Sequence, residues 1–159
     1  MFGFLHGRKE APRLGTLRQL QLFSTLSRPE LRVVDGLLHE RRFLKGEIVF
    51  DQGEEGQTLH VVVAGRVLLC RQGEPEAGRV KVVEAGGMFG ELALLIENAP
   101  RALQARADED CVLASLARGD LESLLDTHAV IASKILLQFT RHLGRMLVEQ
   151  SAGIERRSP

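Results

Sequence analysis

The chain has 159 residues, which is enough for one domain with a sizeable hydrophobic core. Lys and Arg together number 21, as do Asp and Glu, so the net charge is zero and no general attraction to nucleic acid or to an anionic membrane is expected. No apolar run is long enough for a spanning helix or a signal peptide, so we expect a cytoplasmic protein, and the excess of Arg over Lys weakly indicates a bacterial source.

The chain divides into a leader, one domain and a tail. Residues 1–13 have no apolar period and are expected to be flexible. Residues 151–159 are polar and are expected to form a loose tail. The domain between them, 14–150, is expected to contain a β-rich part at about 42–116 and C-terminal helices at about 120–150.

Two short helices are predicted at the start of this domain. Apolar residues recur at helical spacing over 16–22, which predicts the first helix. Ser27 and Glu30 stand three residues apart with a proline between them, which is the pattern of a capping box at a helix start. We therefore expect the second helix to follow Ser27 and to end near His39.

The middle of the chain is predicted to be β-structure. Short apolar runs, many of them β-branched, alternate there with glycine turns, which is typical of an antiparallel sandwich or barrel. Cys70 and Cys111 both lie in apolar runs, so we expect buried free thiols. The predicted strands lie at 43–44, 48–50, 59–63, 67–70, 80–83, 102–107 and 111–116.

The stretch over 86–95 combines a glycine turn with the start of a short helix. Such a start presents several backbone N–H groups to one point and favours an anion there. Glu91 lies in this stretch, and Arg101 follows ten residues later, directly after a proline. A carboxylate can hold a sugar hydroxyl and a guanidinium can hold a phosphate through two parallel hydrogen bonds, so we predict a site for a ribose phosphate.

A long helix is predicted from about His128 to Gln150, with an apolar stripe of four-three spacing that extends over about two heptads. Two interpretations compete: the stripe packs on the β-rich part, or it pairs with a second copy of the chain. Further apolar residues widen this face, so one side of the helix can pack on the β-rich part while the other meets a second copy of the chain. We therefore expect a homodimer. The stripe consists of Ala132, Leu136, Phe139, Leu143 and Met146.

The sequence Phe-Gly-Glu-Leu-Ala-Leu at 89–94, followed by Pro-Arg-Ala at 100–102, resembles the phosphate-binding cassette of the cyclic nucleotide-binding domain family. Gly46, Gly53 and Gly65 also stand where this family has glycines at its turns, so the resemblance covers most of the chain. It implies a mainly β fold: an antiparallel eight-stranded β-roll, similar to a jelly-roll barrel, with N-terminal helices and a long C-terminal helix. It also implies a regulatory sensor for a cyclic nucleotide.

The resemblance assigns a role to each residue of the cassette. The backbone amides of Gly90, Glu91 and Leu92 would face the cyclic phosphate, and the Glu91 carboxylate would accept the ribose 2′-hydroxyl. Arg101 would neutralise the phosphate, and the Ala102 amide would add a hydrogen bond. The pocket for the base would be lined by apolar strand residues such as Leu69 and Val83.

Two positions after the arginine differ from the family pattern. Many members have Ser or Thr where this chain has Ala102, and a hydroxyl there helps to hold cyclic GMP, so cyclic AMP is expected as the preferred ligand. Leu103 stands at the site where the family has a small residue, and Gln104 follows. Leu103 either crowds the pocket or turns away from it. The alternative function is therefore a degenerate scaffold for dimerisation that binds no nucleotide.

Catalysis, metal binding and a built-in output are not expected. The five histidines are scattered without a pair at ligand spacing, and no Ser-His or Cys-His arrangement stands out, so we expect no enzyme, metal or cofactor. Only nine residues follow Gln150, too few for a DNA-binding module. The signal is therefore expected to pass through an unidentified effector protein, by movement of the C-terminal helix.

Overall fold

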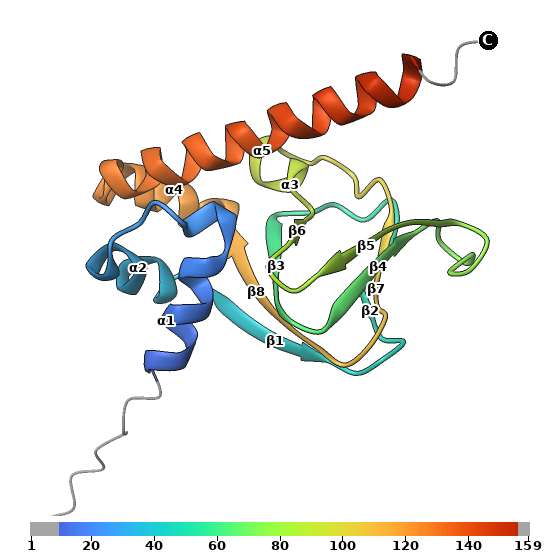
Figure 1. The fold of residues 1–159 in the computed structure, drawn as a ribbon, viewed down its shortest axis with the longest axis horizontal. Helices are drawn as coiled ribbons and strands as arrows, with labels where there is room; N and C mark the ends of the chain where they lie inside the picture. Colours follow the sequence, from blue (N-terminus) through green and yellow to red (C-terminus); the bar gives the residue numbers. More distant parts are fainter. Residues whose placement is uncertain (1–9, 156–159) are drawn as a thin grey trace, which may run out of the picture.

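Two antiparallel β-sheets form the middle of the structure, a computed structural model that describes residues 10–155 (Figure 1). One sheet has the strand order β1-β8-β3-β6 and the other the order β2-β7-β4-β5. The prediction of eight antiparallel strands is confirmed, but their hydrogen bonds define two four-stranded sheets and not a closed barrel. The strands are β1 (His39–Phe43), β2 (Ile48–Phe50), β3 (Thr58–Ala64), β4 (Arg66–Cys70), β5 (Arg79–Glu84), β6 (Met88–Phe89), β7 (Gln104–Ala107) and β8 (Cys111–Ala117).

Helices lie beside and above the sheets, and the longest, α5, crosses over the short helix α3 in Figure 1. The predicted boundary of the leader at residue 13 is wrong, because α1 begins at residue 10. Residues 1–9 of the leader lie outside the described part. The tail prediction is wrong at its start, because α5 continues to residue 155; residues 156–159 also lie outside the described part. The helices are α1 (Glu10–Gln19), the 3₁₀ helix η1 (Gln21–Phe23), α2 (Arg28–Asp35), α3 (Leu92–Leu95), α4 (Arg118–Thr127) and α5 (Ala129–Glu155).

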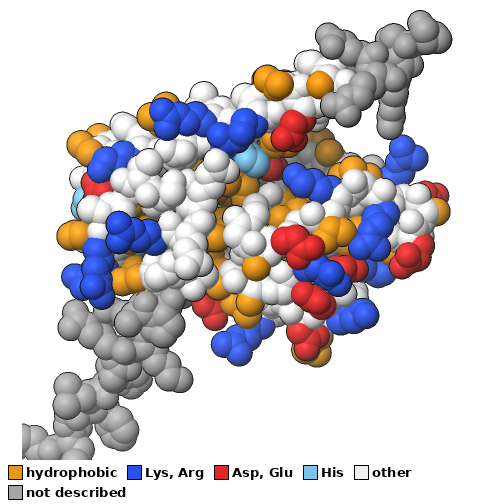
Figure 2. Space-filling view, in the orientation of Figure 1, with side chains coloured by type: hydrophobic (Ala, Val, Ile, Leu, Met, Phe, Trp, Pro, Cys, Tyr) orange, Lys and Arg blue, Asp and Glu red, His pale blue; other side chains and the backbone are white. Residues whose placement is uncertain are grey.

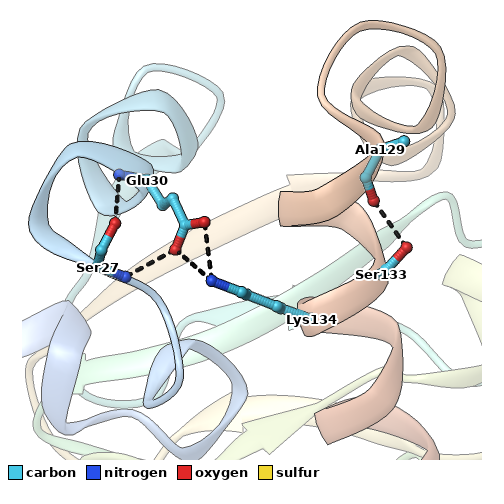
Figure 3. Close-up of polar contacts among 5 residues, drawn as sticks. All are labelled: Ser27, Glu30, Ala129, Ser133 and Lys134. Carbon is cyan, nitrogen blue, oxygen red and sulfur yellow. Dashed lines mark hydrogen bonds and ion pairs between the residues drawn. The ribbon is translucent and has the colours of Figure 1, made fainter.

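The start of α2 has the predicted capping box, and this cap also ties α2 to α5. The Ser27 hydroxyl accepts from the Glu30 amide at 3.4 Å, and the Ser27 amide donates to the Glu30 carboxylate at 2.8 Å. Lys134 of α5 donates to both oxygens of the same carboxylate at 2.9 Å (Figure 3). The pKa of Glu30 is lowered, first by the hydrogen bond from Lys134 and then by those from Ser27.

The helix α2 ends four residues before the predicted end, because the chain turns at Gly36 and then enters β1. This strand reads His-Glu-Arg-Arg-Phe, and its first four residues are exposed. It pairs on one side only, with β8. A charged edge strand of this kind carries no apolar alternation, which is why the sequence pattern placed the β-rich part three residues too late.

The alternation of β3 separates two cores. Leu59 and Val61 belong to the larger core beneath the helices, whereas Val62 belongs to a smaller core between the sheets. Successive side chains of a strand point to opposite faces of the sheet, so this one strand contributes residues to both cores. The helix-covered core also contains Phe23 and Phe139, both almost fully buried. The site described below lies at the inter-sheet core.

The buried face of α5 corrects the predicted dimer stripe. Ala132 is 0 % exposed and Phe139 is 1 % exposed, and both pack in the helix-covered core. Leu136 and Leu143 are half-buried against the same core, and Met146 is half-buried farther along the helix. The four-three stripe therefore packs within the chain. No helix in residues 10–155 is long and apolar enough to cross a membrane.

Candidate functional site

The segment that carries Arg101 is held by main-chain hydrogen bonds to the loop between β2 and β3. The Arg101 amide donates to the Glu54 carbonyl at 2.8 Å, and the Gly53 amide donates to the Arg101 carbonyl at 2.8 Å. The preceding residue, Pro100, forms an isolated bridge with Glu55. Because the backbone is fixed on both sides, the direction in which the Arg101 side chain leaves it is fixed too.

The Arg101 side chain runs inward and is 8 % exposed. Nη1 donates to the Gly90 carbonyl at 3.2 Å, and Nη2 donates to the Thr58 carbonyl at 3.0 Å and to the Thr58 hydroxyl at 3.2 Å. The guanidinium lies over the ring of Phe50, with 4.1 Å between Cζ and the ring centroid. Carbonyl dipoles and an aromatic face thus stabilise the buried cation.

Within the described residues, Arg101 forms no ion pair with a carboxylate. Burial lowers the pKa of its guanidinium, while the more distant charges of Glu54 and Glu91 raise it. An arginine side chain has five N–H donors, and three are used in the bonds named above. A buried positive charge with unused donors and no carboxylate partner among the described residues is suited to an anionic ligand.

Two glycines make room for this guanidinium. Gly90 has φ +77°, which favours glycine, and a Cβ built there would lie 2.6 Å from Nη1 of Arg101. Gly56 has no such backbone requirement, yet a Cβ there would lie 2.4 Å from both Cζ and Nε of Arg101. Contacts this short do not occur between real atoms, so any side chain at either position displaces the arginine.

Glu91 directly precedes α3 and faces α5. Its carboxylate Oε1 lies 3.2 Å from Nε2 of His142, and both side chains are mostly buried, 15 % and 17 % exposed. The backbone of Glu91 is already helical, so the predicted helix start is confirmed to within one residue. The residue predicted to hold a sugar hydroxyl thus also contacts the C-terminal helix.

The other predicted site residues differ in how far they are buried. Val83 is buried in the inter-sheet core and Leu69 packs against it, so their predicted role beside the base stays a prediction. Ala102 and the side chain of Leu92 are exposed. Leu103 is half-buried and belongs to neither core. The structure brings Gly90, Glu91 and Arg101 together.

Sequence reasoning missed three residues that contact this group. Thr58 opens a strand and reads as an ordinary β-residue, and His142 was one of five scattered histidines. Gly56 reads as part of a glycine turn, although its φ is ordinary and its function is to leave space. Of these three residues, only Gly56 could have been noticed in the sequence. It lies three residues after Gly53, and one turn does not require two glycines.

Between residues 10 and 155 there is no group of three or more His, Cys, Asp or Glu side chains that could hold a metal ion. Cys70 and Cys111 are buried free thiols, as expected. Burial is the main cause that raises the pKa of each thiol. A thiol with a raised pKa is a poor nucleophile, so neither cysteine is suited to covalent chemistry.

A protein-family model for the cyclic nucleotide-binding domain matches residues 40–128 of the chain. A cAMP-dependent protein kinase regulatory subunit from Mucor circinelloides is 36 % identical over 71 % of this chain and 29 % of its own length. The cyclic AMP receptor protein of Thermus thermophilus is 31 % identical over 77 % of this chain and 56 % of its own length. The chain thus spans less than a third of the length of the first relative and somewhat more than half of the length of the second.

A solved cyclic nucleotide-binding domain from Methylobacillus flagellatus has the same fold, with a TM-score of 0.80, 19 % identity, and coverage of 93 % of this chain and 85 % of that one. Together with the family match, the cassette geometry identifies the class: this chain belongs to the cyclic nucleotide-binding domain family. The relatives named above are the regulatory subunit of a kinase and a receptor protein.

Proposed function

We propose that this chain is a regulatory module that binds a cyclic nucleotide, with cyclic AMP preferred over cyclic GMP, and that signals through a partner protein. The observation that carries the proposal is the buried guanidinium of Arg101, which has unused donors and no carboxylate partner among the described residues. A cyclic phosphate carries one negative charge, which equals in magnitude the single positive charge of the guanidinium. The ligand is exchangeable, and neither a metal nor a cofactor is needed.

The remaining groups of the site follow from this placement of the phosphate. Gly90 and the first residues of α3 supply backbone amides, and Glu91 accepts the ribose 2′-hydroxyl. Leu69 and Val83, at the inter-sheet core, lie against the base. The preference for cyclic AMP is supported by Ala102, which has no hydroxyl, and by the printed names of both relatives above.

The direct test is calorimetric titration of the purified chain with cyclic AMP and, separately, with cyclic GMP. Calorimetry suits this chain because it has no Trp or Tyr for fluorescence. Saturable binding of cyclic AMP that is tighter than binding of cyclic GMP supports the proposal. No binding of either, in a folded sample free of co-purified nucleotide, favours the scaffold alternative, with Leu103 as the first residue to replace by alanine.

The role of Glu91 predicts a difference between two ligands. A charge-assisted hydrogen bond contributes about 1.5–3 kcal/mol, and ~1.4 kcal/mol is one decade in affinity. We therefore expect 2′-deoxy cyclic AMP to bind at least about tenfold more weakly than cyclic AMP. In Glu91→Ala the two ligands should bind equally, whereas the exposed control Glu97→Ala should keep the difference. Equal binding of both ligands to the unsubstituted chain excludes this role.

The contact between Glu91 and His142 gives the signal a route out of the site. A ribose hydroxyl at Glu91 competes with, or rearranges, the hydrogen bond that holds α5 beside α3. A second ion pair, from Lys134 of α5 to Glu30, involves no residue of the cassette, so we expect it to persist (Figure 3). Ligand binding is thus expected to move the distal part of α5, which a partner can sense.

The exposed side of α5 provides the surface for a homodimer. Seven residues with alternating spacings of three and four are all exposed, from the first turns of α5 to its distal part. Figure 2 shows exposed hydrophobic side chains along the distal part of this helix. Apolar residues at heptad spacing favour pairing of two helices, and Val130, Leu137 and Leu147 are the large exposed hydrophobic residues of this stripe. This exposed stripe consists of Val130, Ser133, Leu137, Thr140, Gly144, Leu147 and Ser151.

Negative charges introduced into the exposed stripe should therefore cause the dimer to dissociate into monomers. We expect the double variant Leu137→Glu, Leu147→Glu to sediment as a monomer at concentrations where the unsubstituted chain sediments as a dimer. Val80→Glu, an equally exposed position on β5, should leave the dimer intact. A dimer that survives both stripe substitutions places the interface elsewhere. The cytoplasmic location and bacterial source stay predictions.

A further inference from the structure

His60 is a buried histidine whose imidazole lies inside the fold next to the candidate site. It stacks on Phe89, with 5.1 Å between ring centroids and 23° between the ring planes. Its centroid also lies 5.7 Å from that of Phe50, the ring that carries the Arg101 guanidinium. The side chain is 8 % exposed, so both of its nitrogens depend on protein groups for hydrogen bonds.

Both nitrogens have such a partner. Nδ1 lies 2.8 Å from the Ser115 hydroxyl, across the pairing of β3 with β8, and Nε2 lies 3.1 Å from the Thr58 hydroxyl. The Thr58 hydroxyl in turn accepts from Nη2 of Arg101. A continuous chain of hydrogen bonds therefore runs from Ser115 through His60 and Thr58 to the guanidinium.

The charge of the ring follows from its surroundings. Burial, and then the positive charges of Arg101 and Arg41, lower the pKa of His60 from 6.5 to about 3, so the ring is neutral at physiological pH. A neutral imidazole has one donor and one acceptor nitrogen. The Thr58 hydroxyl accepts from Arg101 and still has its proton and a second lone pair, so it can bond Nε2 in either tautomer, while the Ser115 hydroxyl takes the complementary role at Nδ1.

We propose that His60 is a positioning residue of the site: through the Thr58 hydroxyl it holds the Arg101 guanidinium in the orientation that offers its unused donors to an anionic ligand. The part that concerns the ligand rests on the proposed function. The part that concerns the orientation of Arg101 applies to the ligand-free chain as well.

The first test is a double-mutant cycle read out as affinity for cyclic AMP. His60→Phe keeps a ring between Phe50 and Phe89 but removes both hydrogen bonds, and Thr58→Val removes the hydroxyl but keeps the main-chain carbonyl. A neutral hydrogen bond is worth about a factor of 2–10 in affinity, so each variant should bind about fivefold more weakly. The affinity of the double variant for cyclic AMP should be no weaker than that of either single variant.

Two controls distinguish positioning from a general loss of stability. His60→Gln retains an acceptor for the Thr58 hydroxyl and should restore most of the affinity that His60→Phe loses. Thr127→Val removes a hydroxyl that bonds only within its own helix region and should leave affinity unchanged. Losses that add in the double variant, or a glutamine that restores nothing, overturn the proposal.

The second test needs no ligand. In ¹⁵N nuclear magnetic resonance spectra of the free chain, we expect a neutral His60 ring with one proton and slow rotation of the Arg101 guanidinium. The slow rotation should be lost in His60→Phe and in Thr58→Val. An Arg101 signal that both substitutions leave unchanged contradicts the positioning role, even if the chain binds neither nucleotide. Failure to bind would contradict the proposed function alone.

Discussion

Replacement of Arg101 by alanine is expected to lower the affinity for cyclic AMP by at least about tenfold, because a charge-assisted hydrogen bond contributes about 1.5–3 kcal/mol and ~1.4 kcal/mol is one decade. The guanidinium is the positive charge that the site buries, and its donors are fixed by Gly90 and Thr58. Titration calorimetry with cyclic AMP measures the loss. Arg101→Lys should recover only part of it, because an ammonium group cannot form two parallel hydrogen bonds.

The controls for this variant concern both folding and charge. Arg101→Ala leaves the Gly90 and Thr58 carbonyls without their buried donor, so its thermal midpoint should be measured beside its affinity. Arg42→Ala removes an equal charge from an exposed side chain and should change neither quantity. An affinity within twofold of the unsubstituted chain, in a folded Arg101→Ala sample, would falsify the assignment of the phosphate to this residue.

The fold was predictable where the sequence carries a period. The runs over 59–63, 67–70 and 80–83 alternate or are β-branched, and each lies within a strand of the structure. The charged strand β1 has no such pattern. The two-residue strand β6 was also missed, because its sequence was interpreted only as a part of the cassette. Whether eight strands close into one barrel depends on pairing between distant strands, which no local pattern records.

The C-terminal helix shows the same limit. A four-three apolar stripe predicts that a face is buried but not what buries it. Here the helix-covered core takes that face through Ala132 and Phe139. On the opposite, exposed side, Ser133, Thr140 and Gly144 stand among the apolar residues, so no continuous apolar stripe stands out in the sequence.

The site was predictable in its charged residues and not in its supporting ones. Glu91 and Arg101 follow from chemistry and spacing, because a carboxylate and a guanidinium near a glycine turn have few structural uses. Thr58, His60 and His142 reach the site from β3 and α5: Thr58 is 43 residues from Arg101 along the chain, and His142 is 51 residues from Glu91. Their contribution appears only when the sheets and α5 bring them beside Arg101 and Glu91.

Gly56→Ala is expected to reduce binding of cyclic AMP about as much as the loss of Arg101 itself, by at least about tenfold. The new methyl group would lie 2.4 Å from Cζ and Nε of Arg101, so the guanidinium has to leave its place over Phe50. The backbone at Gly56 does not require positive φ, so the change acts through space and not through strain.

The shortest contacts of the new methyl group are to Arg101, so we expect the effect to act through the arginine, and a second variant tests this. In an Arg101→Ala background the methyl group fills the space that the side chain vacates, so Gly56→Ala should cause no further loss of affinity. A methyl group at Gly119, where nothing lies within 4 Å, is the matched control and should leave binding unchanged. Independent, multiplying losses in the double variant would mean that Gly56 serves the fold through Ala93, whose Cβ is also close at 2.9 Å, and not the placement of Arg101.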